Sequence, residues 1–340
     1  IMRNNILDFY RIIFTLIICL HHFQGTLDTK IISTGYIGVE FFFILSGFFL
    51  YKSFKKNNNE TAFQYTVKRI KRLYPEYILA FILCFILQMA QSGKEKSVDC
   101  IFQAISEITL MQNIGIFRGG FNYPLWYLSV LIFAGYIVYE LLKKDKETFI
   151  KIISPITIVF TFSLLNSLGK GLENWNTVYG IYLPLLRGFS DICIGVLISE
   201  FVDTKYFKDI EEKKVKFRIV EILTYACLLY IIIFQNKFEM YSILLIPIVI
   251  LAANNKNSLA YKFFNWKIFG NIGKLTYTMY LNHVSFIILT SFLYNKVLHK
   301  NISMILIIVI YIGALILYSI ISRKIVYKLI EKSTKTDKSG

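Results

Sequence analysis

Apolar runs long enough to cross a lipid bilayer recur from one end of this 340-residue sequence to the other. A helix needs about 20 predominantly apolar residues to cross ~30 Å of hydrocarbon. Candidate spans of that kind are residues 6–23, 36–54, 74–91, 124–142, 149–168, 179–201, 217–235, 238–253, 270–294 and 302–325. With 55% apolar residues and a mean hydropathy of +0.53, the chain is predicted to fold as an all-α, polytopic membrane bundle of about ten transmembrane helices.

The basic residues predict how these spans are oriented. Most of the 38 Lys and Arg residues lie at the N-terminus, in the C-terminal tail, and in alternate loops at 52–73, 143–151, 200–218 and 254–269. By the positive-inside rule, those loops and both termini are expected to face the cytoplasm. The net charge of +16 then reflects topology and attraction to the anionic lipid bilayer, so no nucleic-acid partner is expected.

No linker rich in Pro, Gly or Ser divides the chain, so we expect one transmembrane domain at residues 1–327 and a short basic cytoplasmic tail at 328–340. The sequence contains no GxGxxG, CxxC or HExxH motif. We therefore expect no metal site and no nucleotide-hydrolysing site.

The first span carries ionisable residues near both of its ends, Arg11 and His22. Eleven steps of ~100° bring these two residues to within about 20° of one helix face, ~17 Å apart along the axis. Asp8 lies one turn before Arg11 on that face and is expected to pair with it. His21 points ~100° away, so the spacing selects His22 as the functional histidine. The alternative is an interfacial pair of histidines with a snorkelling arginine.

The second span descends from the outer face and places Glu40 near the depth of His22. A carboxylate there is expected to orient the His22 ring and to stabilise its protonated form. The alternative is that Glu40 faces a lipid head group or pairs with Lys30. At the outer end of the fourth span, Trp126 is compatible with an interfacial anchor and with a wall on which a sugar stacks.

Arg69 and Arg72 lie three residues apart, on one helix face, just before Pro75 at the cytoplasmic end of the third span. The chain uses Lys for most of its positive charge and contains only eight arginines. An arginine therefore indicates a planar, bidentate contact with phosphate or carboxylate. The alternative role for this pair is a topological anchor on lipid head groups.

Three more ionisable residues lie within spans. Arg187 and Asp191 are four residues apart on the sixth span and are expected to pair with each other. His283 lies in the middle of the ninth span, where a satisfied core histidine and a catalytic histidine are both compatible with the pattern.

Several motifs occur in a fixed order along nearly the whole chain. They are R-x10-H (Arg11, His22), GVEFFFILSGFFL (38–50), RxxR (Arg69, Arg72), LWYLS (125–129), LRGFSDICIGVLI (186–198) and YTMYLNH (277–283). This ordered set resembles the acyltransferase-3 family of integral membrane O-acyltransferases. We expect the membrane domain only, without the fused hydrolase-like domain that many members carry.

The resemblance implies transfer of an acyl group, usually acetyl, from cytoplasmic acyl-CoA to a hydroxyl of a cell-surface or lipid-linked carbohydrate. It implies that the pair Arg11 and His22 is essential and that Arg69 and Arg72 engage the donor, with Arg11 beside the channel. From the residues themselves we expect His22 to act as general base or as acylated nucleophile, and Glu40 and Trp126 to contact the acceptor. Acetyl-CoA is then a donor substrate, and no permanently bound cofactor is expected.

The expected location is the plasma membrane, and usage rich in Lys, Ile and Asn suggests a bacterial source. A rival class is a proton-coupled secondary transporter, or an acyl-group translocator that works with a separate transferase, because buried Arg, Glu and His also serve proton relays. The hydropathy shows no obvious pair of matching interrupted helices in two halves, which favours the enzyme.

Overall fold

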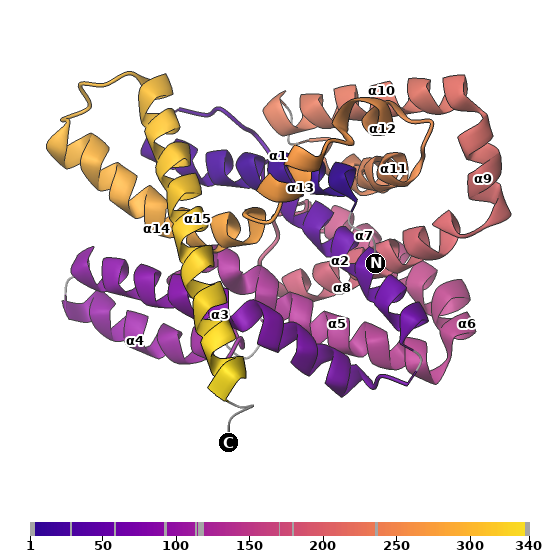
Figure 1. Ribbon diagram of the computed structural model, residues 1–340, viewed down its shortest axis with the longest axis horizontal. Coiled ribbons are helices and arrows are strands. Elements are labelled where there is room, and N and C mark those ends of the chain that lie inside the picture. The colour runs from indigo at the N-terminus through magenta and orange to yellow at the C-terminus, as the bar shows by residue number, and fades with distance from the viewer. Residues whose placement is uncertain are drawn as a thin grey trace.

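The computed structural model of the protein describes residues 4–336, except residues 28, 58, 92–93, 113, 115–118, 170, 179 and 235–236. The described residues form a bundle of α-helices (Figure 1), so the predicted all-α fold class is confirmed. The last residues of the expected tail, 337–340, lie outside this part of the chain.

Long helices make up the body of the bundle, and short helices and turns connect them (Figure 1). The long helices are α1 (Asn5–Phe23), α2 (Ile37–Lys56), α3 (Ala62–Gln91), α5 (Trp126–Lys144), α7 (Ser154–Ser167), α8 (Leu183–Val202), α10 (Lys214–Phe234), α11 (Ser242–Asn254), α14 (Thr276–Phe292) and α15 (Met304–Thr336). The remaining helices are α4 (Lys94–Ile108), α6 (Lys146–Thr148), α9 (Lys205–Glu212), α12 (Leu259–Phe264) and α13 (Lys267–Ile272).

The connecting turns include three of 3₁₀ type and two of π type. The 3₁₀ turns are η1 (Gln24–Thr26), η2 (Tyr123–Leu125) and η4 (Glu239–Tyr241), and the π turns are η3 (Phe149–Ile153) and η5 (Leu293–Val297). Two short strands, β1 (Thr177–Val178) and β2 (Ile181–Tyr182), form an antiparallel pair with Thr177 opposite Tyr182.

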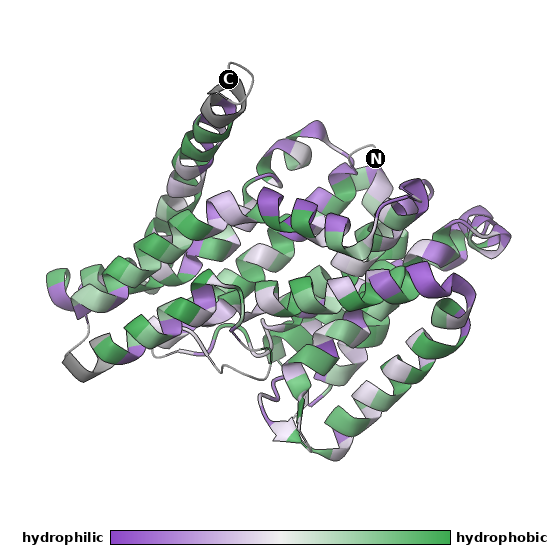
Figure 2. Cartoon of the chain, turned by 90° about the horizontal axis from the view of Figure 1, so that it is seen from below, coloured by the Kyte–Doolittle hydropathy of each residue, from purple (hydrophilic) through white to green (hydrophobic). Residues whose placement is uncertain are grey.

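Every predicted span overlaps a helix. In the described chain, seven helical segments are long and apolar enough to cross a membrane by themselves: Asn5–Thr26, Ile37–Lys56, Ala62–Gln91, Tyr123–Lys144, Lys146–Ser167, Lys214–Phe234 and Met304–Glu331. Figure 2 shows hydrophobic residues along the long helices, and many of their outward side chains are exposed, as expected for surfaces that face lipid.

Three predicted spans correspond to helices that are too short or too charged to meet this criterion of length and hydropathy. Helix α8 is 20 residues long but carries Arg187, Asp191 and Glu200. Helices α11 and α14 have 13 and 17 residues, and the turns η4 and η5 extend them. Most residues of α8 and α14 are buried by neighbouring helices, so these two helices do not need a fully apolar surface.

Helix α3 begins twelve residues before the predicted start at residue 74 and continues through Pro75. Its 30 residues correspond to ~45 Å, which exceeds the ~30 Å hydrocarbon core. The first turns of α3, with Arg69 and Arg72, therefore extend past one end of the apolar layer.

Both termini lie at this same end of the bundle (Figure 2). Asn4, just before α1, and Arg323, in the C-terminal half of α15, line one cavity together with Arg69 of α3. We call this side the basic end. An even number of membrane crossings places both termini on one side, as the orientation predicted from the basic loops requires.

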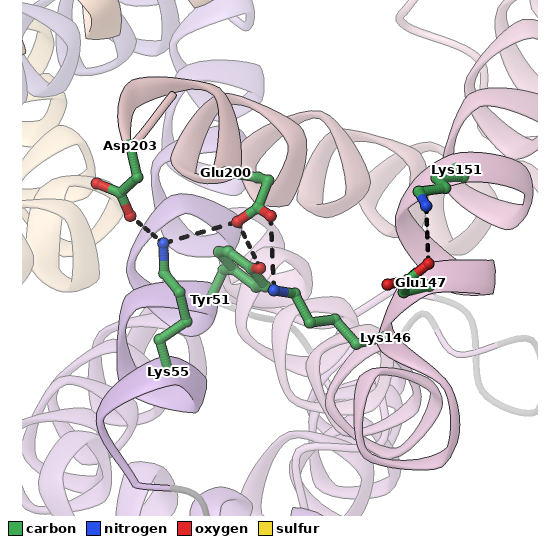
Figure 3. A network of polar contacts seen from close by, with 7 residues as sticks. All are labelled: Tyr51, Lys55, Lys146, Glu147, Lys151, Glu200 and Asp203. Atoms are coloured by element: carbon green, nitrogen blue, oxygen red, sulfur yellow. Dashed lines mark hydrogen bonds and ion pairs between the residues drawn. The ribbon is translucent and has the colours of Figure 1, made fainter. Parts of the chain in front are cut away.

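A polar network ties three helices together at the basic end (Figure 3). The Tyr51 hydroxyl of α2 donates to Glu200 of α8 (2.6 Å), and Lys146 of α6 lies 3.5 Å from the other oxygen of that carboxylate. Lys55 of α2 forms ion pairs with Glu200 and Asp203. Glu200 therefore fixes the ends of α2, α6 and α8 relative to one another.

Helices α2 and α8 cross so closely that their backbones touch, and two glycines make this possible. A Cβ atom on Gly47 would lie 2.1 Å from the carbonyl oxygen of Ile192, and one on Gly195 would lie 2.0 Å from that of Ile44. Small residues allow membrane helices to approach to this distance. The crossing also brings Glu40 of α2 against Arg187 of α8.

We predict that Gly195→Ala destabilises the protein, because its methyl group would overlap backbone atoms that cannot rotate away. Overpacking of this kind costs about 1–3 kcal/mol or more. Thermal unfolding of the detergent-solubilised protein, followed by size-exclusion chromatography, measures the loss. Gly135→Ala in α5 is the matched control, since its Cβ would meet only Leu50 Cδ1 at 3.8 Å. Equal stability of the two variants would contradict the proposed backbone contact.

Candidate active site

A cavity of about 670 Å³ enters the bundle from the basic end, between α1, α2, α3, α5, α14 and α15. Helix α2 lines it from Val39 to Ser53, a stretch that covers ~21 Å of helix. The cavity is therefore long, and it extends through most of the apolar thickness of the bundle.

Cationic side chains gather along this cavity: Arg11, Arg69, Arg72, Lys274 and Arg323. Three of them are the arginines for which the sequence predicts a role near the donor. Lys274 and Arg323 were not predicted as site residues, because the sequence shows them only as basic residues at the edges of the ninth and tenth predicted spans.

Carboxylates balance only part of this positive charge. In the described lining, Asp8 and Glu76 are the acidic residues. The predicted pairing of Asp8 with Arg11 is confirmed, with Arg11 Nη1 at 2.9 Å from Asp8 Oδ1. The Arg11 guanidinium also lies 5.2 Å from the centre of the Phe49 ring. Arg11 is thus held in place inside the cavity by a buried carboxylate and an aromatic face.

Arg69 and Arg72 retain capacity to bind an anion. Arg69 Nη1 donates to the Tyr65 hydroxyl (2.7 Å), which supports the guanidinium without neutralising it. Within the part of the chain that the structure describes, neither arginine forms an ion pair with a carboxylate. Two neighbouring guanidinium groups that share an open cavity form a strong site for phosphate.

Tyr127 and Tyr280 close the inner end of the cavity. The Tyr127 hydroxyl lies 3.2 Å from Ser46 Oγ and donates to the Phe42 carbonyl at 3.2 Å, and the Tyr280 hydroxyl donates to the Pro124 carbonyl. Between the cations and these tyrosines the walls are mostly apolar: Val39, Phe42, Leu45, Phe49, Leu128 and Leu131.

His22 lies beyond Tyr280 and is paired with His283 of α14. Nδ1 of His22 is 2.8 Å from Nε2 of His283, and the two rings are nearly parallel, with an interplanar angle of 12°. Nδ1 of His283 is 2.6 Å from the Tyr280 carbonyl oxygen. His283 is fully buried, whereas His22 is half-buried.

These contacts determine the tautomer of both rings. A carbonyl oxygen can only accept, so Nδ1 of His283 carries the proton and donates a hydrogen bond to the Tyr280 carbonyl. In neutral His283 the Nε2 atom is then an acceptor, and Nδ1 of His22 must donate to it. Nε2 of His22 therefore carries a free lone pair, which is what a general base or a nucleophile requires.

His21 has a different environment from His22, as the helical spacing predicts. The Gly35 N–H donates to Nδ1 of His21 (3.3 Å), and a Cβ atom on Gly35 would lie 2.3 Å from the Cβ of His21. His21 therefore packs against the start of α2, while His22, ~100° further round α1, faces α14.

The expected hydrogen bond between Glu40 and His22 is wrong, because Glu40 points to another helix. Gly38 of α2 is the residue that packs against α1, where a Cβ atom would lie 2.7 Å from Ile18. Glu40 lies ~200° further round α2, and its Oε1 is 3.2 Å from Nε of Arg187 on α8. The partner of His22 is an imidazole on α14 instead.

Arg187 and Asp191 were expected to pair within α8, but the ion pair that Arg187 forms is with Glu40 of α2, at 3.2 Å between Nε and Oε1. All three side chains are buried, and the Asp191 carboxyl interacts with both Glu40 and Arg187. One guanidinium thus faces two carboxyl groups. Such a cluster fixes α2 against α8, because a charged group inside an apolar bundle is costly unless an opposite charge lies beside it.

Trp126 does not form an open wall. Its side chain is 4% exposed and packs with its ring 5.1 Å from the Arg187 guanidinium. The exposed aromatic residue near the histidines is Tyr123, which is 46% exposed and meets the His22 ring edge-on at 5.1 Å. The sequence analysis did not select Tyr123 as a site residue. Its position just before Pro124 and the fourth predicted span does indicate a residue at the outer membrane surface.

Glu107 of α4 holds the loop that carries Tyr123. The Asn122 N–H donates to Glu107 Oε1 (3.0 Å), and a Cβ atom on Gly120 would lie 2.2 Å from that oxygen. Burial raises the pKa of Glu107 to about 8. Because Gly120 has no side chain, the Glu107 carboxyl group fits beside it and anchors the loop that carries Tyr123 over His22.

The fold and the cavity define a multi-pass membrane protein whose interior cavity carries cations at one end and has mostly apolar walls further in. The model of the acyltransferase-3 family, described as an acyltransferase domain, matches residues 4–323, nearly the whole chain. The protein therefore belongs to this family and is a membrane acyltransferase. No curated protein and no solved structure matches the chain.

We predict that His283→Ala lowers the kcat of acyl transfer about 100-fold or more while leaving the donor KM nearly unchanged, since it removes the acceptor that orients His22. His283→Asn keeps an acceptor oxygen and should retain more activity. His22→Ala should abolish transfer, and His21→Ala is the matched control. Equal losses in the His21 and His22 variants, at equal amounts of folded protein, would refute this assignment.

A second prediction concerns the buried cluster. Arg187→Met should destabilise the protein by about 3–5 kcal/mol, because it leaves two buried carboxyl groups without their cation. Glu40→Gln should cost much less, since Arg187 keeps Asp191. Thermal unfolding in detergent measures both. A stable Glu40→Gln protein with strongly reduced kcat would instead assign Glu40 a direct role in the reaction.

Proposed function

We propose that the protein transfers an acyl group, acetyl in the simplest case, from cytoplasmic acyl-CoA to a hydroxyl of a cell-surface or lipid-linked carbohydrate at a bacterial plasma membrane. One observation carries this proposal. The cavity gathers cations at the basic end and runs ~21 Å inward to Tyr280, whose carbonyl holds His283 against His22.

The shape of the cavity suits the shape of the donor. Coenzyme A carries its phosphates at one end and its thioester at the end of a long, flexible and largely uncharged arm. Arg69 and Arg72 would bind phosphates at the basic end, and the arm would lie along the apolar walls, with Leu45 and Phe49 among them. The thioester would then reach Tyr127 and Tyr280, close to the histidine pair.

The reaction follows from the tautomer of His22. Its Nε2 accepts the proton of the acceptor hydroxyl while that oxygen attacks the thioester carbonyl carbon. The carbon–sulfur bond breaks, the ester forms, and His22 returns the proton to the coenzyme A sulfur, which leaves as the thiol. His283 accepts from Nδ1 of His22 throughout, and so keeps the reactive nitrogen directed toward the substrates.

The same lone pair would also serve if His22 itself became acylated. A first turnover without acceptor separates the two routes, because the nucleophile route leaves labelled acetyl on the protein and the base route does not.

Tyr280 separates the two halves of this site. It lines the cavity on one side, and on the other its ring lies 5.6 Å from that of His283. For the thioester to reach His22, the Tyr280 side chain must move aside and give up its hydrogen bond to Pro124. The acceptor would approach from the opposite side, where exposed Tyr123 offers an aromatic face for a sugar ring.

The decisive experiment supplies acetyl-CoA, labelled in the acetyl group, to the purified protein in lipid vesicles. The enzyme should transfer or hydrolyse the acetyl group, and His22→Ala should not. A transporter would leave acetyl-CoA intact or move it across the vesicle membrane unchanged, and this result would overturn the proposed reaction.

In the same assay we predict that Arg69→Lys and Arg72→Lys each raise the donor KM about tenfold, because lysine keeps the charge but loses the planar fork. The matched control is Lys71→Ala, which removes a charge from the same helix at a residue that does not line the cavity. An unchanged KM in both arginine variants would return these residues to the role of topological anchors.

A further inference from the structure

The C-terminal half of α15 contributes a second group of residues to the donor cavity. Arg323 and Tyr327 are one helical turn apart, and both line the cavity, as does Lys274 just before α14. Tyr327 is 55% exposed, and the side chain of Arg323 is 21% exposed. Helix α15 has 33 residues and crosses the bundle in Figure 1, so it is longer than the apolar layer is thick. It carries Arg323 and Tyr327 to the cavity.

Arg323 is held in position by contacts with three neighbours. Its Nη1 donates to the Lys274 carbonyl and lies 3.7 Å from Glu76 Oε1, and its Nη2 donates to the Tyr327 hydroxyl (2.7 Å). Its guanidinium carbon is also 5.0 Å from the centre of the Tyr327 ring. Thr278 donates to the other oxygen of Glu76, so the carboxylate is itself anchored to α14.

These contacts do not remove the positive charge of the mouth. Glu76 is shared between Arg323 and Thr278, while the Lys274 Nζ atom donates to the neutral amide of Asn271 at 3.3 Å. The described lining of the cavity therefore keeps an excess of cations over carboxylates. Part of that excess belongs to α3, and part belongs to the wall formed by α14 and α15.

Two separate cationic groups suit a ligand with two separate phosphate groups. Coenzyme A has a pyrophosphate next to its flexible arm and a further phosphate on the 3′ hydroxyl of its adenosine. A preorganised guanidinium beside an ammonium group recognises a phosphate dianion, and an exposed aromatic ring next to it stacks well with a purine. The wall of α14 and α15 offers all three groups.

We propose that Lys274, Arg323 and Tyr327 form a 3′-phosphoadenosine subsite, with the phosphate at Lys274 and Arg323 and the adenine against Tyr327. The proposal rests on the proposed function, in that the donor is an acyl-CoA. The pyrophosphate then falls to Arg69 and Arg72. The subsite gives the protein a means to distinguish a coenzyme A thioester from a thioester on a shorter carrier.

The test measures the dissociation constants of coenzyme A and of 3′-dephospho-coenzyme A for the full chain in nanodiscs of neutral phosphatidylcholine. Coenzyme A should bind about tenfold tighter than the dephospho form. Arg323→Ala and Lys274→Ala should each weaken coenzyme A binding about tenfold and leave the dephospho form unchanged. Tyr327→Leu should weaken both ligands equally, while Tyr327→Phe should weaken neither.

Lys324→Ala is the matched control, because this exposed lysine is next to Arg323 but does not line the cavity. Lys274→Ala tests the subsite without disturbing the fold, since it leaves the contact between Arg323 and Glu76 in place. Variants with unchanged affinity for coenzyme A would overturn the subsite. Equal weakening of both ligands by Arg323→Ala and Lys274→Ala would overturn the assignment of the 3′-phosphate.

Failure of the subsite is distinguishable from failure of the proposed donor. If Arg69→Ala weakens coenzyme A binding but Arg323→Ala and Lys274→Ala do not, the subsite fails and the proposed donor stands. If wild-type protein binds neither ligand, the proposed donor fails as well. An effect of Arg323→Ala that appears only in nanodiscs with anionic lipid would assign this arginine to a lipid phosphate instead and would overturn the subsite.

Discussion

The structure depends on one constraint, namely that an ionisable side chain inside an apolar bundle needs a partner or a polar cavity. Glu40 and Arg187 meet across the closest helix crossing, and Asp8 holds Arg11 beside the cavity. Each pair joins residues that would be costly to bury alone. The first pair is enclosed and serves the fold, whereas the second borders open space and leaves a guanidinium within reach of a ligand.

The histidine pair satisfies the same constraint without a net charge. Neutral His283 donates a hydrogen bond to the Tyr280 carbonyl and accepts one from His22, so each buried contact is satisfied without a charged ring. A carboxylate in place of His283 would add a buried negative charge. The imidazole orients His22 equally well, and it leaves the reactive nitrogen free.

The distribution of charge along the cavity favours a transferase over a proton relay. Its cations stand at one end, its middle is apolar, and tyrosine hydroxyls close its inner end. A continuous relay would need ionisable groups throughout that apolar stretch. An amphiphilic donor with phosphates at one end needs the pattern that is present, and the family to which the chain belongs carries out acyl transfer.

The sequence alone determined the helical fold and the two depths at which Arg11 and His22 lie, because hydropathy and a helical period of 3.6 residues are local properties. It also singled out Arg69 and Arg72 through residue type. The partner of His22 was decided only by tertiary structure. The depth of a residue can be read from its position in a span. The direction of Glu40, however, depends on which face of α2 packs against α1, and Gly35 and Gly38 set that packing. The meeting of His22 with His283 joins residues 261 positions apart, and no local pattern encodes such a contact.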